Sequence, residues 1–181
     1  MKYIALLRGI NISGKNKIAM EELRNVLQKN GYQNVITYLN SGNVIFESIS
    51  TSKQTLMQDI NKIIKNQFNL DIPVFVLTDI ELEDVINHRP IWWATEDKNI
   101  YNNLICIIPP ATFKEIYTTV GEPSKDIEKV QEYDRFIFWS FDLKNYRKAN
   151  WWIKTASTSI KDNITIRTAN TMKKVLEICK N

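Results

Sequence analysis

Alternating hydrophobic and polar positions in the first 88 residues predict a regular succession of strands and helices. Short apolar runs predict four strands, over Tyr3–Arg8, Val35–Leu39, Val44–Glu47 and Pro73–Leu77. Helical spacing predicts one helix over Ile18–Asn30, which Gly31 ends, and a second helix that Ser52 begins. Thr78 and Glu81 form a capping-box pattern, so a further helix follows the fourth strand. We expect Ser41 and Gly42 to form a two-residue hairpin between the second and third strands.

The second half of the chain repeats this order of elements. Apolar runs predict four strands, over Asn103–Ile108, Ile127–Tyr133, Phe136–Phe141 and Ile164–Arg167. Helical spacing predicts three helices, over Thr112–Val120, Lys144–Thr158 and Ala169–Lys180. Asp134 and Arg135 form the turn between the middle strands, and Thr168 caps the last helix.

Both halves therefore have the order β-α-β-β-α-β and end in one extra helix. This order predicts an α+β protein made of two ferredoxin-like (split βαβ) units, each followed by an extra helix. We expect the first unit to span residues 1–88, a linker residues 89–102, and the second unit residues 103–181. The halves share no obvious sequence repeat, but the matching order indicates an internal duplication.

Composition favours an ordinary globular protein. The 181 residues are 44% hydrophobic and 24% charged, which is enough for a buried core. Arg8 interrupts the apolar run near the N-terminus, so neither a signal peptide nor a membrane span can be assembled there. We therefore expect a cytoplasmic protein with no membrane partner. Cys106 and Cys179 are interpreted as reduced, packed thiols.

Charge is distributed unevenly along the chain, although the net charge is only +4. Residues 2–17 carry four basic side chains and no acidic one. Residues 144–174 carry eight basic side chains against the single acid Asp162. Two interpretations stay open: solvated surfaces of an ordinary protein, or a functional basic face that binds an anionic partner.

The segment after the first strand concentrates glycine, amide side chains and positive charge. This combination favours an anion held by backbone N–H groups and basic side chains. The candidate ligand-binding residues there are Arg8, Gly9, Asn11, Gly14, Lys15, Asn16 and Lys17. The spacing of Gly9 and Gly14 approaches that of a P-loop, but Asn16 lacks the hydroxyl that would bind magnesium. Turns need glycine in any case, and exposed surfaces carry lysine.

A second candidate segment is the predicted hairpin, with Asn40, Ser41, Gly42 and Asn43. In a split βαβ unit, this hairpin and the loop after the first strand emerge at the same end of the sheet. We therefore expect the two loops to converge, with Arg8 beside them. Lys154 and Arg167, from the basic C-terminal segment, are further candidates.

His88 is the only histidine, so no histidine-based metal cluster can form, and we expect neither a metal site nor a cofactor. A Ser-His-Asp or Cys-His catalytic system would depend wholly on His88, which its place after an acidic helix marks as an ordinary exposed residue. Five tryptophans are many for this length. Core or inter-unit packing is the first interpretation, and base stacking or a dimer contact is the second.

Several motifs together resemble one known family. The motifs are Tyr3–Asn11, Gly14–Lys17, Met20–Arg24 and Tyr38–Phe46. They closely resemble the domain-of-unknown-function 1697 family of bacterial proteins. Residues Ile166–Thr171 are similar to that family's C-terminal motif, which extends the resemblance over the whole chain and adds Asn170 to the candidate residues. Residues Asn87–Trp93 stand where many relatives have an Asn-Pro-Phe element. The resemblance supports the fold and marks positions, but it implies no particular reaction.

Three hypotheses about function stay open. The first is a module that binds a phosphate-bearing ligand, a nucleotide or a nucleic acid, through the two converging loops. The second is an enzyme that uses the same pocket for phosphoryl or acyl transfer, for which the sequence offers no activated nucleophile. The third is an oligomeric structural protein, such as a homodimer, whose edge strands and tryptophans form an interface. The first is favoured, because charge and backbone freedom gather at one place.

Overall fold

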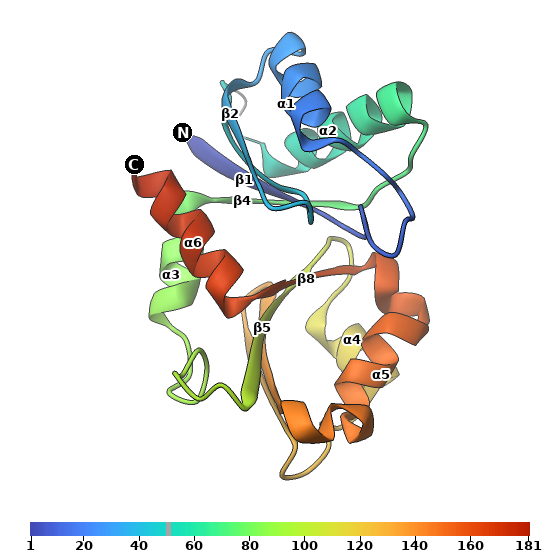
Figure 1. Cartoon of the computed structure of the whole chain (residues 1–181), viewed down its shortest axis with the longest axis vertical. Coiled ribbons are helices and arrows are strands. Elements are labelled where there is room, and N and C mark those ends of the chain that lie inside the picture. Colours follow the sequence, from blue (N-terminus) through green and yellow to red (C-terminus); the bar gives the residue numbers. More distant parts are fainter. Residues whose placement is uncertain (50–51) are drawn as a thin grey trace. The chain divides into compact units, whose positions relative to one another are not determined.

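The computed structural model describes residues 1–49 and 52–181 of the chain. It is a mixed α+β structure with two four-stranded antiparallel sheets and helices beside them (Figure 1). Residue contacts divide the chain into two compact units, of which the first contains Met1–Glu83 and Val175–Asn181 and the second contains Asp84–Lys174. The domain boundaries expected from the sequence stay a prediction.

The first sheet has the strand order β2-β3-β1-β4. Its strands are β1 (Lys2–Leu7), β2 (Gln33–Tyr38), β3 (Asn43–Glu47) and β4 (Val74–Thr78). Helices α1 (Met20–Lys29) and α2 (Lys53–Phe68) cover one face of this sheet, and α3 (Asp79–Asn87) follows β4 (Figure 1). Each of these elements is one that the sequence predicts.

Local side chains explain where these helices begin and end. Ser52 accepts a hydrogen bond from the Thr55 N–H at 3.2 Å and so caps α2. The expected capping box of α3 is confirmed, because the Thr78 N–H donates to Glu81 Oε2 at 2.8 Å and the Glu81 N–H donates to Thr78 Oγ1 at 3.1 Å. Gly31, with a φ of 92°, follows the last residue of α1 and its C-cap, as expected.

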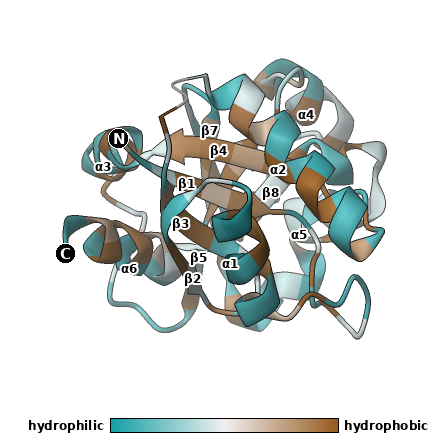
Figure 2. Ribbon diagram, turned by 90° about the horizontal axis from the view of Figure 1, so that it is seen from above, coloured by the Kyte–Doolittle hydropathy of each residue, from teal (hydrophilic) through white to brown (hydrophobic). Residues whose placement is uncertain are grey.

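The core of the first unit lies between its sheet and the helices α1 and α2. Alternate residues of β1, namely Tyr3, Ala5 and Leu7, belong to this core. Figure 2 shows teal and brown residues alternating around α1 and α2, because each helix buries only one stripe, which holds Leu23 in α1 and Ile60 in α2. Strand β4 is brown because four of its five residues are hydrophobic, and these four are buried.

The second sheet has the strand order β6-β7-β5-β8. Its strands are β5 (Ile100–Ile107), β6 (Glu128–Tyr133), β7 (Phe136–Asp142) and β8 (Ile164–Thr168). The helices are α4 (Phe113–Val120), α5 (Asn150–Ser157) and α6 (Ala169–Lys180). The Thr171 N–H donates to Thr168 Oγ1 at 3.2 Å, which confirms the cap of α6. The end of α6 belongs to the first unit, where Lys2 Nζ donates to the Cys179 carbonyl.

Core packing of tryptophan is confirmed for three of the five residues. Trp139 and Trp151 lie in the core that joins the second sheet to α4 and α5, and Trp93 is 2% exposed. Cys106 and Cys179 are both free and buried, as expected. Burial raises the pKa of the Cys106 thiol to about 12, and the positive charge of Arg167 opposes this effect only in part.

The expectation of a two-residue hairpin between β2 and β3 is wrong. Tyr38 pairs with Asn43, so that Leu39–Gly42 form a four-residue loop. The buried side chain of Asn43 causes this, because its Nδ2 donates to the Tyr38 carbonyl at 2.8 Å and so closes the strand pair at that point. The positive φ values fall at the two ends of the loop, with 58° at Leu39 and 76° at Gly42.

The expectation of one helix over Lys144–Thr158 is also wrong. A 3₁₀ helix, η1 (Leu143–Lys148), is separated from α5 by Ala149, whose backbone is extended. Two carboxylates explain the break: Asp142 accepts from the Lys144 N–H at 2.8 Å and begins η1, and Glu128 of β6 accepts from the Trp151 N–H at 3.0 Å and begins α5. A second 3₁₀ helix, η2 (Ser159–Asp162), precedes β8 and has no counterpart in the prediction.

Candidate functional site

The loop between β1 and α1 is folded by left-handed backbone conformations. Positive φ values occur at five of its residues, Gly9, Asn11, Ser13, Gly14 and Asn16. Glycine and asparagine are the residue types that adopt this conformation at least cost. The glycine and asparagine content of the loop is therefore explained first by its backbone path.

The tip of the loop, Ile12–Lys15, is a tight turn. The Lys15 N–H donates to the Ile12 carbonyl at 2.9 Å, and both central residues have positive φ, as in a type I′ turn. The turn leaves Lys15 exposed, and Lys17 is exposed two residues later. Among residues 1–49 and 52–181, no carboxylate lies within 4.0 Å of either ammonium group.

The side chain of Asn11 holds this loop against the Leu39–Gly42 loop. Its Nδ2 donates to the carbonyls of Ile18 and Asn40, each at 2.9 Å, and its Oδ1 accepts from the Ile18 N–H at 2.9 Å. The convergence of the two loops, expected from the topology, is therefore present in the first unit. All hydrogen-bonding groups of the Asn11 amide are engaged within the protein.

Further hydrogen bonds stiffen the base of the loop. The Asn11 N–H donates to the Asn16 carbonyl at 3.1 Å, and Asn16 Nδ2 donates to the Gly9 carbonyl at 3.0 Å. Arg8 is half-buried at the end of β1, where its N–H donates to the Pro73 carbonyl at 2.9 Å. The asparagine side chains thus bond the backbone of the loop and give it one defined shape.

Gly42 and Asn43 serve the packing of the second loop. A Cβ atom at Gly42 would lie 2.7 Å from Ile10 Cδ1 and 2.8 Å from Leu7 Cβ, so only glycine fits there. The Gly42 carbonyl accepts from the Leu7 N–H at 2.9 Å. Asn43 is fully buried, and its Nδ2 also donates to Ser41 Oγ at 3.1 Å. The Asn43 side chain therefore lies beneath the surface of the site.

A shallow pocket of about 410 Å³ opens where the two loops meet the start of α1. It is lined by Asn11, Gly14, Lys17, Ile18, Ala19, Met20 and Asn40. Ala19 is the N-cap of α1 and supplies no side-chain hydrogen bond, whereas Glu21 and Glu22 lie in the first turn. The pocket thus combines one lysine, two amide side chains and an uncapped helix start.

Three of the sequence-predicted residues belong to the second unit. Lys154 Nζ donates to the Val120 carbonyl at 2.9 Å. Arg167 is 7% exposed, and one of its guanidinium nitrogens donates to Thr165 Oγ1 and to the Ile166 carbonyl, each at 2.9 Å. Asn170 is exposed in the first turn of α6. Within this unit, Lys154 and Arg167 bond the protein's own backbone.

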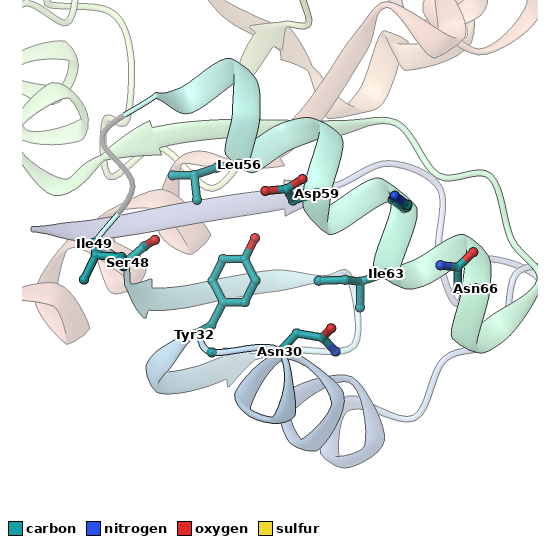
Figure 3. A pocket seen from close by; sticks show the side chains of 10 residues that line it. Asn30, Tyr32, Ser48, Ile49, Leu56, Asp59, Ile63 and Asn66 are labelled. Atoms are coloured by element: carbon teal, nitrogen blue, oxygen red, sulfur yellow. The ribbon is translucent and has the colours of Figure 1, made fainter.

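The first unit has a second cleft that sequence reasoning missed (Figure 3). It has a volume of about 460 Å³, and its lining includes Asn30, Tyr32, Asp59, Ile63 and Asn66. Figure 3 shows the Tyr32 hydroxyl pointing toward Asp59. Burial and the negative charge of Asp59 together raise the pKa of Tyr32 to about 12. These residues come from separate elements and share no motif, so no sequence signal could have grouped them.

Across residues 1–49 and 52–181, no three side chains of the types His, Cys, Asp and Glu gather closely enough to hold a metal ion. Over the same ranges, no helix combines the length and the apolar character needed to cross a membrane.

Comparison with known proteins identifies the family. A family model described as a protein of unknown function (DUF1697) matches residues 1–138. No curated protein matches the chain. A conserved bacterial protein from Streptococcus pneumoniae has a similar solved structure, with a TM-score of 0.85 and 28% sequence identity over 98% of this chain and 97% of that chain. The chain therefore belongs to the DUF1697 family.

Proposed function

We propose that the first unit binds a phosphate-bearing ligand in the pocket between the β1–α1 loop and the Leu39–Gly42 loop. One observation carries the proposal: Lys15 and Lys17 have no ion-pair partner among the described residues and stand just before an α1 start that has no side-chain cap. Uncapped N–H groups at a helix start carry partial positive charge, and together with lysine they attract an anion.

The rigidity of the loop favours this proposal. Asn11 and Asn16 hold the loop in one conformation. Because the loop is already ordered, binding an anion costs little conformational entropy. Among the described residues, the N–H groups of Gly14 and Lys17 have no hydrogen-bond acceptor and are available to phosphate oxygens.

The proposed ligand is a nucleotide or a nucleic acid, because the pocket is open and shallow and suits a phosphate that is part of a larger molecule. The residues that line it include no Asp, Glu or His. A transfer enzyme would need such a group as a base or a metal ligand. Binding is therefore proposed, and no observation favours phosphoryl or acyl transfer at this place.

We also propose that each sheet, together with its two covering helices, is a ferredoxin-like unit. The orders β2-β3-β1-β4 and β6-β7-β5-β8 are equivalent when the second set is counted from β5. Each is the order that a β-α-β-β-α-β chain takes in the split βαβ arrangement. The equivalence supports an internal duplication and explains why the loop after β1 and the loop after β2 lie at the same end of the first sheet.

The proposal is tested by calorimetric titration of the full chain with tripolyphosphate and with ATP, at about 20 mM and about 200 mM NaCl. The double variant Lys15→Ala with Lys17→Ala should bind about fivefold or more weakly, roughly 1 kcal/mol, and should lose part of the salt dependence. The matched control is Lys29→Ala with Lys62→Ala, which removes two exposed lysines of the same unit and should leave the affinity unchanged.

Substitution of the acidic residues at the start of α1 should change the anion affinity in the opposite direction. Glu21→Gln with Glu22→Gln removes two carboxylates from the first turn and should tighten anion binding. The proposed site is wrong if the wild-type chain binds neither tripolyphosphate nor ATP. It is also wrong if the Lys15 and Lys17 double variant binds as tightly as the Lys29 and Lys62 control.

A further inference from the structure

One corner of the second unit gathers aromatic rings and positive charges. It consists of Tyr101 at the start of β5, Lys144, Tyr146, Arg147 and Lys148 on η1, and Trp152 on α5. We call this set the aromatic-basic corner. Segment η1 is the orange stretch that precedes α5 in Figure 1.

A buried ring brings the two outer aromatic residues to one place. Phe141 is 2% exposed, and its ring centroid lies 5.3 Å from that of Tyr101 and 5.3 Å from that of Trp152. The Leu143 N–H also donates to the Asn99 carbonyl at 2.8 Å, which joins the start of η1 to the residues before β5. Tyr101 and Trp152 therefore both contact the Phe141 ring, although they are 51 positions apart in the sequence.

These outer rings are exposed although their neighbours are buried. Trp152 is 43% exposed and Tyr101 is 36% exposed, whereas Trp139 and Trp151 are 2% exposed or less. The Trp152 ring is held in place by the edge of Tyr146, at a centroid distance of 5.5 Å and an angle of 87°. A ring that is held in place and partly exposed can serve as a stacking platform for another flat ring.

Three basic residues lie on η1 together with Tyr146. Residues three apart lie on the same side of a 3₁₀ helix, so Lys144 and Arg147 share one side of η1. The Arg147 guanidinium carbon lies 5.7 Å from the Tyr146 ring centroid, and its Nε donates to the Tyr146 hydroxyl at 3.1 Å. Within the described chain, no carboxylate oxygen lies within 4.0 Å of a side-chain nitrogen of Lys144, Arg147 or Lys148.

The acid nearest in sequence is engaged elsewhere. Asp142 accepts from the Lys144 N–H at 2.8 Å and from Asn145 Nδ2 at 2.7 Å. These hydrogen bonds lower the pKa of the Asp142 carboxyl, which keeps it ionised as the cap of η1. The side chains of Lys144, Arg147 and Lys148 form no ion pair within the described residues, so their positive charges remain available to an outside anion.

We propose that the aromatic-basic corner binds single-stranded nucleic acid. Bases stack on the exposed faces of Trp152 and Tyr101, and Lys144, Arg147 and Lys148 pair with the phosphates between them. Every base has a flat face, so this combination binds single strands with little sequence preference, whereas a duplex keeps its bases covered. The proposal rests on residues of the second unit alone and stands whether or not the first unit binds a phosphate.

The test is fluorescence anisotropy of a labelled oligothymidylate of about 12 nucleotides, titrated with the full chain over a range of salt concentrations. Trp152→Ala should weaken binding about 5- to 150-fold, and Trp152→Phe, which keeps a flat ring, should restore most of it. Lys144→Ala with Arg147→Ala should make the slope of log K against log salt less negative by about 1.4.

Two matched variants separate this site from the rest of the chain. Lys114→Ala with Lys125→Ala removes two exposed lysines from the same unit and should change neither affinity nor slope. Lys15→Ala with Lys17→Ala weakens the anion site proposed for the first unit, but it should retain the part of oligonucleotide binding that depends on Trp152. Circular dichroism verifies that each variant is folded, and the lysine and arginine variants decide the outcome if Trp152→Ala unfolds.

Three results would overturn the inference. The first is an absence of oligonucleotide binding at low salt by the wild-type chain. The second is binding that neither Trp152→Ala nor the Lys144 and Arg147 double variant weakens. The third is a preference for phosphatidylserine vesicles over the oligonucleotide that depends on these same residues, which would make the corner a lipid-binding surface.

Discussion

The side-chain amide of Asn11 donates a hydrogen bond to the backbone carbonyl of Asn40 at 2.9 Å, across 29 positions of sequence. The same side chain bonds Ile18 in both directions. One asparagine therefore sets the shape of both loops that border the proposed anion site. These hydrogen bonds explain why asparagine stands at position 11 even without a ligand. They also hold the proposed anion site in one conformation before a ligand binds.

Asn11→Ala should destabilise the first unit by about 2–4 kcal/mol. The change removes three hydrogen bonds and places alanine at a φ of 55°. Asn11→Gly removes the same bonds without the backbone strain and should cost less. Urea denaturation measures both, with Asn25→Ala on the exposed side of α1 as the control. If Asn11→Ala costs no more than the control, the clamp is not important for stability.

Gly42→Ala should be clearly more destabilising than Gly14→Ala. Both glycines have positive φ, 76° and 77°, so the backbone penalty is similar, at about 1–2 kcal/mol. An added Cβ at Gly42 would press on Leu7 and Ile10, whereas nothing lies within 4 Å of one at Gly14. Thermal unfolding should therefore separate the two variants by several degrees. Equal melting temperatures would show that the close approach at Gly42 is relieved by small shifts.

Much of the first unit's site can be predicted from sequence, because its features are local or follow from strand order. Gly31, Ser52 and Thr78 end or begin helices as predicted, since caps depend on nearby residues. The convergence of the two loops follows from the order of strands. The length of the β2–β3 loop does not, because it is decided by the buried amide of Asn43.

Contacts between distant elements are what sequence patterns do not reveal. The break before α5 depends on Glu128, which lies 23 positions before Trp151. The aromatic-basic corner depends on Phe141, which supports rings from β5 and α5. The cleft of Figure 3 combines Tyr32 and Asp59, whose segments share no pattern. Only the three-dimensional structure places these residues together.

Glu128→Ala should lower the thermal unfolding midpoint by about 6–12 °C, equivalent to roughly 3 kcal/mol. Glu128 is 6% exposed, and its carboxylate accepts hydrogen bonds from the Trp139 indole and from the N–H groups of Trp151 and Ser124. Alanine would leave the buried donors of Trp139 and Trp151 without an acceptor. Glu128→Gln keeps one acceptor oxygen and should cost less. Glu132→Ala, on the exposed side of β6, is the control, and a similar midpoint for both alanine variants would contradict the role of Glu128.

Glu81 should make stability depend on pH in the acidic range. Burial raises the pKa of its carboxyl, but hydrogen bonds from Lys53 and Thr78 and the charge of Lys53 lower it more, so the pKa lies below its ordinary value of 4.5. The native state thus favours the ionised form. Its stabilising effect is complete above the unfolded pKa and is lost as the pH falls through the lower native pKa.

Glu81→Gln should therefore reduce stability at about pH 7 and make little difference at about pH 2, where both proteins carry a neutral group. The effect is modest, because the side chains of Lys53 and Glu81 are 42% and 38% exposed. Denaturation curves of both proteins across this range measure it. A stability difference that stays constant with pH would show that the ionised form of Glu81 has no special role.

The proposal to be tested first is that the pocket between the β1–α1 loop and the Leu39–Gly42 loop binds phosphate. The most direct measurement is a two-dimensional ¹H–¹⁵N NMR spectrum of the full chain during titration with tripolyphosphate. The amide signals of Gly14, Lys17, Ala19 and Met20, which line the pocket, should shift together and saturate at one affinity. Unchanged signals at these four residues, or saturable shifts confined to Tyr32 and Ile63 in the other cleft, would contradict the account.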